Sequence, residues 1–270
     1  MTIQSMGDGA LDYFPCRYGT SKLIFRGPRR KLDGDYVAFV GGIETYGKFI
    51  PEPFPVLTEQ ETHIKSVNLG CVNAGLDAFA RDQSMIDICT NAKITVIEIM
   101  GASNMSNRYY KVHKRRNDRF LQASGLLRDV YEEIDFTDFH FTKHMLDALA
   151  EEPDKFESVE QELKMAWVAR MTNFIEKIGS KVVLLWMSDE APGTADLNSK
   201  PSFVDRNMLR ILSGLVDDYV EIVAKPKERE AGWEQMVFAP LEEPIAEGVL
   251  GPVVHRRTAD FLSDVILDLT

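Results

Sequence analysis

Five short hydrophobic segments recur along the chain, and glycine or polar residues follow most of them. They occupy residues 36–40, 66–69, 94–100, 181–187 and 219–224. Runs of this length, rich in β-branched residues, are typical of strands that are buried on both faces of a sheet. The pattern therefore predicts five buried strands.

Segments with helical periodicity lie between and after these predicted strands. Apolar residues recur three or four positions apart within residues 76–92, 159–178, 204–215 and 256–269. Alternation of buried strands with helices is typical of a parallel sheet that has helices on both faces. We therefore predict an α/β fold, a three-layer α/β/α sandwich with a five-stranded parallel sheet of flavodoxin-like type. Ligands of such sheets bind beyond the carboxyl ends of the strands, so site residues are expected directly after the strands.

Two regions fall outside the alternation. Residues 1–35 precede the first predicted strand, and we expect them to form an N-terminal extension packed on the core. Residues 102–157 follow the third predicted strand and are expected to form a long insertion that caps the strand ends. Residues 36–270 would then make up one α/β domain that includes this insertion.

Glycine-containing sequences follow three of the predicted strands. Gly41-Gly42-Ile43-Glu44-Thr45 follows the first, Gly70-Cys71-Val72-Asn73-Ala74-Gly75 the second and Gly101-Ala102-Ser103-Asn104 the third, and His255 directly precedes the last predicted helix. This order resembles the SGNH (GDSL-type) hydrolase superfamily, which has a Gly-Asp-Ser turn, a glycine loop, a Gly-x-x-Asn loop and a C-terminal histidine. The resemblance covers residues 36–270, and the chain is also similar to a bacterial protein family of about the same length.

The resemblance implies an esterase-type site. In the superfamily a serine attacks the ester carbonyl, the histidine takes the serine proton, and backbone N–H groups with the asparagine hold the oxyanion. By position, Asn104 matches the asparagine and His255 the histidine. Gly70, Asn73 or Gly75 occupies the glycine loop, and the sequence does not decide among these three.

Two members of the expected triad are absent from their usual positions. Gly42 and Ile43 stand where the superfamily has aspartate and serine, and Pro252 stands where it has the aspartate that orients the histidine. Isoleucine has no nucleophilic group. Thr45 is the nearest displaced hydroxyl, and Ser103 and Ser106 are further alternatives.

Each motif residue also has a purely structural interpretation. Gly42 can serve as a tight strand exit, Asn73 and Asn104 as turn or cap residues, and His255 as a residue that flanks a helix. Glu44 follows a strand end and could act as an acid or base if it is partly buried.

The overall charge is negative, but basic residues are concentrated in two segments. The chain has 31 Lys and Arg against 42 Asp and Glu, a net charge of −11, which disfavours general nucleic-acid binding. Residues 17–31 hold six basic residues and no acid, and residues 108–119 hold six and one acid. We expect the second segment to bind an anionic ligand near the strand ends, through Arg108, His113, Arg115 and Arg116. Pairing of these residues with acids elsewhere in the chain is the alternative.

No sequence pattern predicts a cofactor or a metal. The cysteines Cys16, Cys71 and Cys89 fit neither a disulfide framework nor a zinc pattern, and His140 and His144 match a zinc-binding helix in spacing only. No leader peptide and no apolar segment of membrane-spanning length is visible, so we expect a cytoplasmic protein without a membrane partner. The oligomeric state is not indicated.

These observations leave three functional hypotheses. The first is an SGNH-like protein without the serine that binds a small anionic or carbohydrate-type ligand through Gly42, Glu44, the glycine loop and the basic segment. The second is an esterase or acyl-transfer enzyme that uses Thr45, Asn104 and His255. The third is a group-transfer enzyme with a phosphate-bearing donor.

Overall fold

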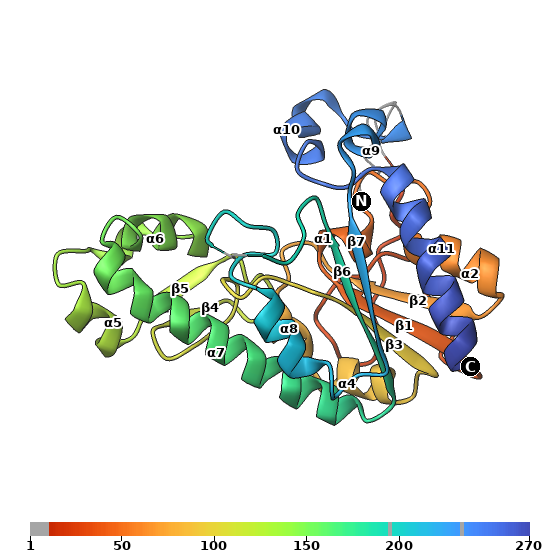
Figure 1. The fold of residues 1–270 in the computed structure, drawn as a ribbon, viewed down its shortest axis with the longest axis horizontal. Helices are drawn as coiled ribbons and strands as arrows, with labels where there is room; N and C mark the ends of the chain where they lie inside the picture. Colours follow the sequence, from red (N-terminus) through yellow and green to blue (C-terminus); the bar gives the residue numbers. More distant parts are fainter. Residues whose placement is uncertain (1–10, 194–195, 233–234) are drawn as a thin grey trace, which may run out of the picture.

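Five parallel strands form the central sheet of the protein (Figure 1). The computed structural model describes residues 11–193, 196–232 and 235–270. The sheet has the order β2-β1-β3-β6-β7 and consists of β1 (Tyr36–Gly41), β2 (Lys65–Gly70), β3 (Ile94–Glu98), β6 (Lys181–Ser188) and β7 (Asp218–Val223). The predicted five-stranded parallel sheet is confirmed, with strand ends that differ from the prediction by one or two residues.

The direction of sheet growth reverses at β1. The chain adds β2 on one side of β1 and then crosses over to add β3 on the other side. Val40 of β1 accordingly pairs with Leu69 of β2 and with Ile97 of β3. A crevice opens at such a switch point, beyond the carboxyl ends of the two strands that flank it. This topology places the residues after β1 and those after β3 side by side.

Helices cover both faces of the sheet (Figure 1). One face carries α2 (Phe54–Thr62) and α11 (Pro252–Leu269), and the other carries α3 (Leu76–Ala80), α4 (Gln83–Thr90), α7 (Pro153–Ile178) and α8 (Arg206–Leu212). Side chains of β1 alternate between the two cores: Val37 and Phe39 pack on the α2 and α11 side, Ala38 and Val40 on the other. This alternation explains why the strand sequence is hydrophobic throughout.

The helix boundaries correct several predictions. The predicted helix over residues 76–92 is two helices, because the chain is non-helical at Asp82, where the backbone is extended. Helices α7 and α11 begin earlier than predicted, at Pro153 and Pro252. Proline favours the first helical position because its φ is already suitable and its missing N–H is not needed there. His255 therefore lies in the first turn of α11 rather than before the helix.

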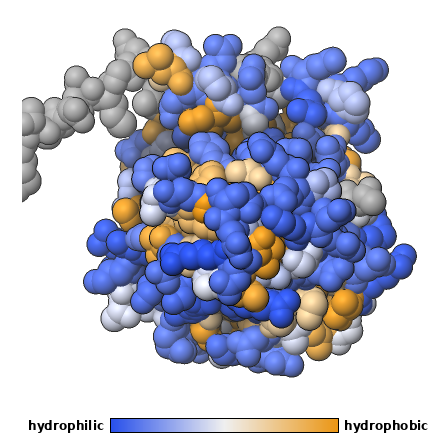
Figure 2. All heavy atoms as spheres, turned by 90° about the vertical axis from the view of Figure 1, so that its left-hand side faces the viewer, coloured by the Kyte–Doolittle hydropathy of each residue, from blue (hydrophilic) through white to orange (hydrophobic). Residues whose placement is uncertain are grey.

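The segment after β3 extends the molecule to one side of the sheet. It contains the antiparallel pair β4 (Tyr110–Val112) and β5 (Phe120–Ala123), followed by α5 (Gly125–Val130), a 3-10 helix (Phe136–Asp138) and α6 (Thr142–Leu149). The ring of Phe120 contacts the rings of both Tyr110 and Phe136. All three belong to the hydrophobic core that also includes α3, α4, α7 and α8. In the view onto this end, the surface is mostly hydrophilic and its hydrophobic side chains are scattered (Figure 2).

The N-terminal segment contributes core residues and a buried arginine. Tyr18 and Phe25 are almost fully buried, and Cys16 and Phe25 form an isolated β-bridge. Arg26 donates hydrogen bonds to the carbonyl oxygens of Gly47 at 2.6 Å and Ile50 at 2.8 Å, and so fixes the chain that leaves α1 (Ile43–Tyr46). This arginine of the first basic segment is therefore structural.

The chain between β7 and α11 is mostly irregular. It contains α9 (Pro226–Ala231), a 3-10 helix (Pro240–Glu242) and α10 (Glu243–Ala246). Within the part of the chain that the structure describes, no helix has the length and apolar character needed to cross a membrane.

Candidate active site

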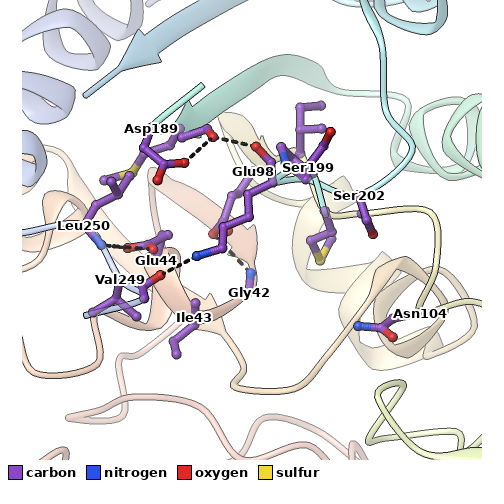
Figure 3. Close-up of a pocket in the computed structure, with 18 of the residues that line it drawn as sticks. Gly42, Ile43, Glu44, Glu98, Asn104, Asp189, Ser199, Ser202, Val249 and Leu250 are labelled. Carbon is purple, nitrogen blue, oxygen red and sulfur yellow. Dashed lines mark hydrogen bonds between the residues drawn. The ribbon is translucent and has the colours of Figure 1, made fainter. Parts of the chain in front are cut away.

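A cavity of about 480 Å³ lies at the carboxyl ends of β1, β3 and β6, at the switch point of the sheet (Figure 3). The loops after β1, β2, β3 and β6 contribute to its wall, together with Lys143 of α6 (Thr142–Leu149), Arg229 of α9 (Pro226–Ala231) and the chain before α11. The polar and charged residues of the wall are Glu44, Asn73, Glu98, Ser103, Asn104, Lys143, Ser188, Asp189, Asn198, Ser199, Lys200, Ser202, Arg229 and Glu247. The cavity occupies the position that the sheet topology predicts for a ligand.

Glu98, the last residue of β3, is the most enclosed acid of the wall. One carboxyl oxygen, Oε2, accepts hydrogen bonds from the Gly42 N–H at 3.1 Å, from the Thr45 N–H at 2.8 Å and from the Thr45 hydroxyl. The other oxygen, Oε1, has no protein donor among the described residues, and the side chain lines the cavity. Glu98 is therefore held through one oxygen, while its side chain lines the cavity.

The glycines after β1 make room for this carboxyl group. A Cβ atom at Gly41 would lie 2.3 Å from Glu98 Oε2 and 2.1 Å from the Thr45 hydroxyl oxygen, distances that no side chain tolerates. The absence of side chains at Gly41 and Gly42 thus allows the Glu98 carboxyl group, at the end of β3, to pack against the backbone at the end of β1.

Glu44 is the second acid at this end of the sheet. Both of its carboxyl oxygens accept from the Leu250 N–H at 3.2 Å. Burial raises the pKa of Glu44 to about 8, with the Leu250 hydrogen bond and the Lys200 charge opposing this rise and the Asp189 charge adding to it. Burial also raises the pKa of Glu98 to about 7, against the hydrogen bonds from Thr45 and Gly42, and the negative charge of Glu44 adds to the rise.

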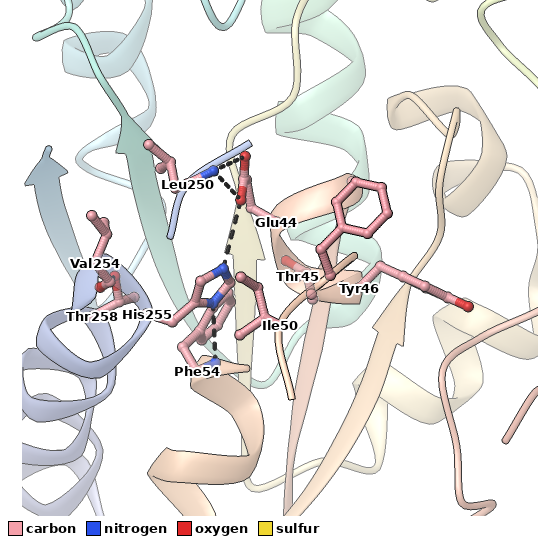
Figure 4. A network of polar contacts seen from close by, with 12 residues as sticks. Glu44, Thr45, Tyr46, Ile50, Phe54, Leu250, Val254, His255 and Thr258 are labelled. Atoms are coloured by element: carbon pink, nitrogen blue, oxygen red, sulfur yellow. Dashed lines mark hydrogen bonds and ion pairs between the residues drawn. The ribbon is translucent and has the colours of Figure 1, made fainter. Parts of the chain in front are cut away.

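His255 lies behind Glu44 and is fully buried (Figure 4). Its Nδ1 accepts from the Phe54 N–H at 3.2 Å, which assigns the proton of the neutral ring to Nε2. Nε2 faces Glu44 Oε2 at 3.7 Å, and the ring stacks on Phe54 with centroids 5.8 Å apart. Burial, with a smaller contribution from the Arg26 charge, lowers the pKa of His255 to about 3. The imidazole is therefore neutral at physiological pH.

The pKa values of both carboxyl groups are raised into the neutral range. The pKa of Glu44 is raised to about 8 and that of Glu98 to about 7, so both groups can exchange protons near pH 7. Two neighbouring carboxyl groups in different protonation states can act as a proton donor and a proton acceptor. The wall at the switch point can therefore perform acid–base chemistry.

Thr45, Asn104 and His255, the residues predicted to form a displaced triad, have separate polar partners. The Thr45 side chain is buried and donates to Glu98. Asn104 lines the cavity to one side of the carboxyl pair, and its Oδ1 accepts from the Thr142 hydroxyl at 2.5 Å (Figure 3). The structure thus brings Thr45 and His255 to the two glutamates rather than to Asn104.

The residues of the predicted glycine loop have different positions. Asn73 lines the cavity. A Cβ at Gly70 would lie 2.2 Å from the Tyr46 nitrogen, and one at Gly75 would lie 2.3 Å from the Asn104 carbonyl oxygen. Gly70 and Gly75 therefore allow close packing of neighbouring loops, and Asn73 is the member of this loop that can touch a ligand.

The four basic residues predicted near the strand ends lie elsewhere. Arg108 pairs with Glu162 at 2.9 Å, and Arg116 lies 3.6 Å from Asp118. His113 accepts the backbone N–H groups of Arg115 and Arg116. The reason is the β4–β5 pair: it carries this segment to a different part of the surface, so the strand-end cavity is lined by other residues.

Sequence reasoning missed the residues that give the cavity its acidity. Glu98 lies inside residues 94–100, a segment whose other six residues are apolar or β-branched and which was predicted as a buried strand. A single charged residue in such a segment could have indicated a functional side chain. Asp189, directly after β6, carried a similar signal. Among the residues that the structure describes, no group of three or more His, Cys, Asp or Glu side chains could hold a metal ion.

Comparisons with known proteins identify the family of the chain. A family model described as "Domain of unknown function (DUF6473)" matches residues 1–270. The solved lipase Lip_vut3 from a goat rumen metagenome is similar at 12% identity and a TM-score of 0.40, over 84% of this chain and 97% of that chain. BT4096, a gut microbial diltiazem-metabolizing enzyme, is similar at 11% identity and a TM-score of 0.34, over 79% of this chain and 40% of that chain. No curated protein matches. Similarities this distant carry no argument about chemistry.

Proposed function

The chain belongs to the DUF6473 family, and we propose that its strand-end cavity is an active site in which Glu44 and Glu98 act on a carbohydrate-type substrate. The observation that carries this proposal is the pair of carboxyl groups on one wall of the cavity, both with raised pKa values. Perturbed carboxyl groups in a cavity at the switch point of a sheet are typical of acid–base sites.

The proposed reaction is hydrolysis by direct attack of water. Ionised Glu98 takes a proton from a water molecule through its free Oε1, and the water oxygen forms a bond to the reacting carbon. The bond from that carbon to the leaving oxygen breaks, and protonated Glu44 gives its proton to the leaving oxygen. Such a reaction needs no nucleophilic side chain, which accounts for isoleucine at the position of the superfamily's serine.

The residues predicted as catalytic take other roles in this proposal. Thr45 is a positioning residue, because its N–H and its hydroxyl both hold Glu98. His255 is a positioning residue behind Glu44, since its neutral Nε2–H faces the Glu44 carboxyl group. Asn104, at the side of the cavity, is proposed to contact the substrate.

The composition of the wall supports a carbohydrate-type substrate. Hydroxyl and amide side chains are abundant, in Asn73, Ser103, Asn104, Asn198, Ser199 and Ser202. The wall also holds four acids against three bases, and one of these bases, Arg229, already pairs with Asp189 at 3.0 Å. A neutral polyhydroxylated molecule therefore fits this wall better than a multiply charged anion.

A turnover screen tests the proposal. The full chain is incubated with p-nitrophenyl glycosides, p-nitrophenyl acetate and acetylated oligosaccharides between pH 6 and 9, beside Glu44→Gln, Glu98→Gln and the control Glu176→Gln. Glu176 is exposed on α7, outside the cavity. General acid–base catalysis contributes typically 10²- to 10⁴-fold, so each cavity variant is expected to lose at least about 100-fold in rate, and the control nothing. Full activity in both cavity variants would contradict the proposal.

Ligand binding without turnover is the second candidate, favoured by the isoleucine at position 43. It predicts saturable binding of an oligosaccharide with no product, and equal affinity for the wild type and the two glutamine variants. The same screen distinguishes the two, because only the enzyme proposal predicts product.

A further inference from the structure

A second cavity, of about 690 Å³, brings the two basic segments of the chain together. Its lining comes from the N-terminal segment, from α3 and the start of α4, and from the turn after β4. Four lining residues are basic: Lys22, Arg81, Lys114 and Arg115. None of its lining residues belongs to the strand-end cavity. Asn73, in the loop after β2, lines the first cavity, whereas Asp77, on α3, lines the second.

The acids of this cavity are already engaged. Asp77 is buried and forms ion pairs with Arg81, at 3.1 Å, and with Arg170. Asp82 accepts from the Ser21 hydroxyl at 2.7 Å. In contrast, Lys22, Lys114 and Arg115 form no ion pair with any described residue. Three unpaired cations thus gather around one cavity of a chain whose net charge is −11.

The basic turn is rigidly held. The side chain of Asn117 is fully buried, and its Oδ1 accepts from the Gly75 N–H at 2.8 Å and the Ala78 N–H at 3.1 Å. Its Nδ2 donates to the His113 carbonyl oxygen at 2.8 Å. These bonds fasten the turn that carries Lys114 and Arg115 to the start of α3. The cations on this turn therefore have a fixed backbone, and neither Lys114 nor Arg115 forms an ion pair with a described acid.

We infer that this second cavity binds a small molecule through a phosphate group or an equivalent dianionic oxyanion. Four basic and two acidic residues give the lining a formal charge of about +2. A phosphate monoester carries about −1.5 to −2 at pH 7, which matches that charge. Arginine donates in a planar fork suited to such groups, and lysine adds a mobile point charge. The volume lies within the range of about 300–1,000 Å³ that is common for small-molecule sites.

Calorimetric titration of the full chain tests this inference. The probes are inorganic phosphate and glucose 6-phosphate at low ionic strength, with the wild type beside Lys114→Ala/Arg115→Ala and Lys22→Ala. Arg128→Ala, which removes an exposed charge on α5, is the matched control. We expect saturable binding of at least one probe, weakened about tenfold or more by the double substitution and by Lys22→Ala, and unchanged in the control. Glu44→Gln is expected to bind normally, which keeps this test independent of the proposed function.

Other outcomes overturn the inference. They are the absence of binding of either probe by the folded wild type, and equal weakening of binding by the control substitution Arg128→Ala. Binding of glucose 6-phosphate without inorganic phosphate supports a site that also contacts the body of an ester, and equal binding supports recognition of the oxyanion alone. Thermal unfolding of each variant confirms that the comparison is made between folded proteins.

Discussion

Replacing Glu98 by glutamine is expected to remove a specific pH dependence of folding stability. In the folded protein burial raises the pKa of this carboxyl group from 4.5 to about 7. A group whose pKa is higher in the folded state binds its proton more tightly there, so it stabilises the fold fully below pH 4.5. That stabilisation is lost as the pH rises through 7.

The size of this change in folding stability follows from the difference between the folded and unfolded pKa values of Glu98. A difference of about 2.5 pKa units, at about 1.4 kcal/mol per unit, corresponds to about 3.5 kcal/mol for a group as buried as Glu98, of which about 3 kcal/mol falls between pH 4.5 and pH 8. The difference in unfolding free energy between wild type and Glu98→Gln should therefore fall by about 3 kcal/mol between pH 4.5 and pH 8. Glutamine has nearly the same shape but does not titrate.

Urea denaturation at closely spaced pH values measures this difference directly. Subtracting the two stability curves cancels all groups that titrate alike in both proteins. The control Glu176→Gln, at an exposed position on α7, should give a curve parallel to that of the wild type. A Glu98→Gln curve parallel to the wild type as well would refute the assignment of a raised pKa to Glu98, and with it the acid–base reasoning.

Four further substitutions test other contacts. Thr45→Val removes a hydroxyl donor from Glu98, so the pH at which stability is lost should move upward in the same urea titration; an unchanged midpoint would contradict the contact. Since the pKa of His255 is lowered to about 3, its neutral form stabilises the fold above pH 6.5 and this stabilisation is lost as the pH falls toward 3. His255→Gln should accordingly make the unfolding free energy less dependent on pH between about pH 3 and 6.5. An equally steep dependence in this variant would argue against the buried neutral ring. Asn117→Ala should cost about 2–4 kcal/mol in urea denaturation, because it leaves buried backbone groups without partners, whereas exposed Asn173→Ala should cost almost nothing. Gly75→Ala should lower stability by about 1–3 kcal/mol, since its Cβ would lie 2.3 Å from the Asn104 carbonyl oxygen, and a neutral effect would contradict this packing.

The sheet could be predicted from the sequence because its signal is local. Strands buried on both faces, such as β1 and β6, are continuous hydrophobic segments, and glycine or a polar residue marks their ends. Helix ends were less well predicted. The start of α11 was predicted four residues too late, because the apolar spacing used for the prediction begins at residue 256, whereas the helix begins at Pro252, a residue that favours the first helical position.

The candidate site was predicted only in part. The position after the strands followed from topology, and Gly42, Glu44, Asn73 and Asn104 do line the cavity. Glu98 was missed, because its pairing with the backbone of Gly42 and Thr45 joins residues more than 50 positions apart. The place of the basic segment also depended on a long-range feature, the β4–β5 pair, which the sequence pattern did not reveal.

In the proposed function, two carboxyl groups, those of Glu44 and Glu98, carry the chemistry of the strand-end cavity. The most direct test is the pH dependence of kcat/KM for the best substrate from the turnover screen. We expect a bell-shaped profile, with an acid limb near pH 7 from Glu98 as the base and an alkaline limb near pH 8 from Glu44 as the acid. Glu98→Gln and Glu44→Gln should each lose at least about 100-fold at the optimum. A profile that is flat from pH 6 to 9, with both variants fully active, would contradict the proposed function.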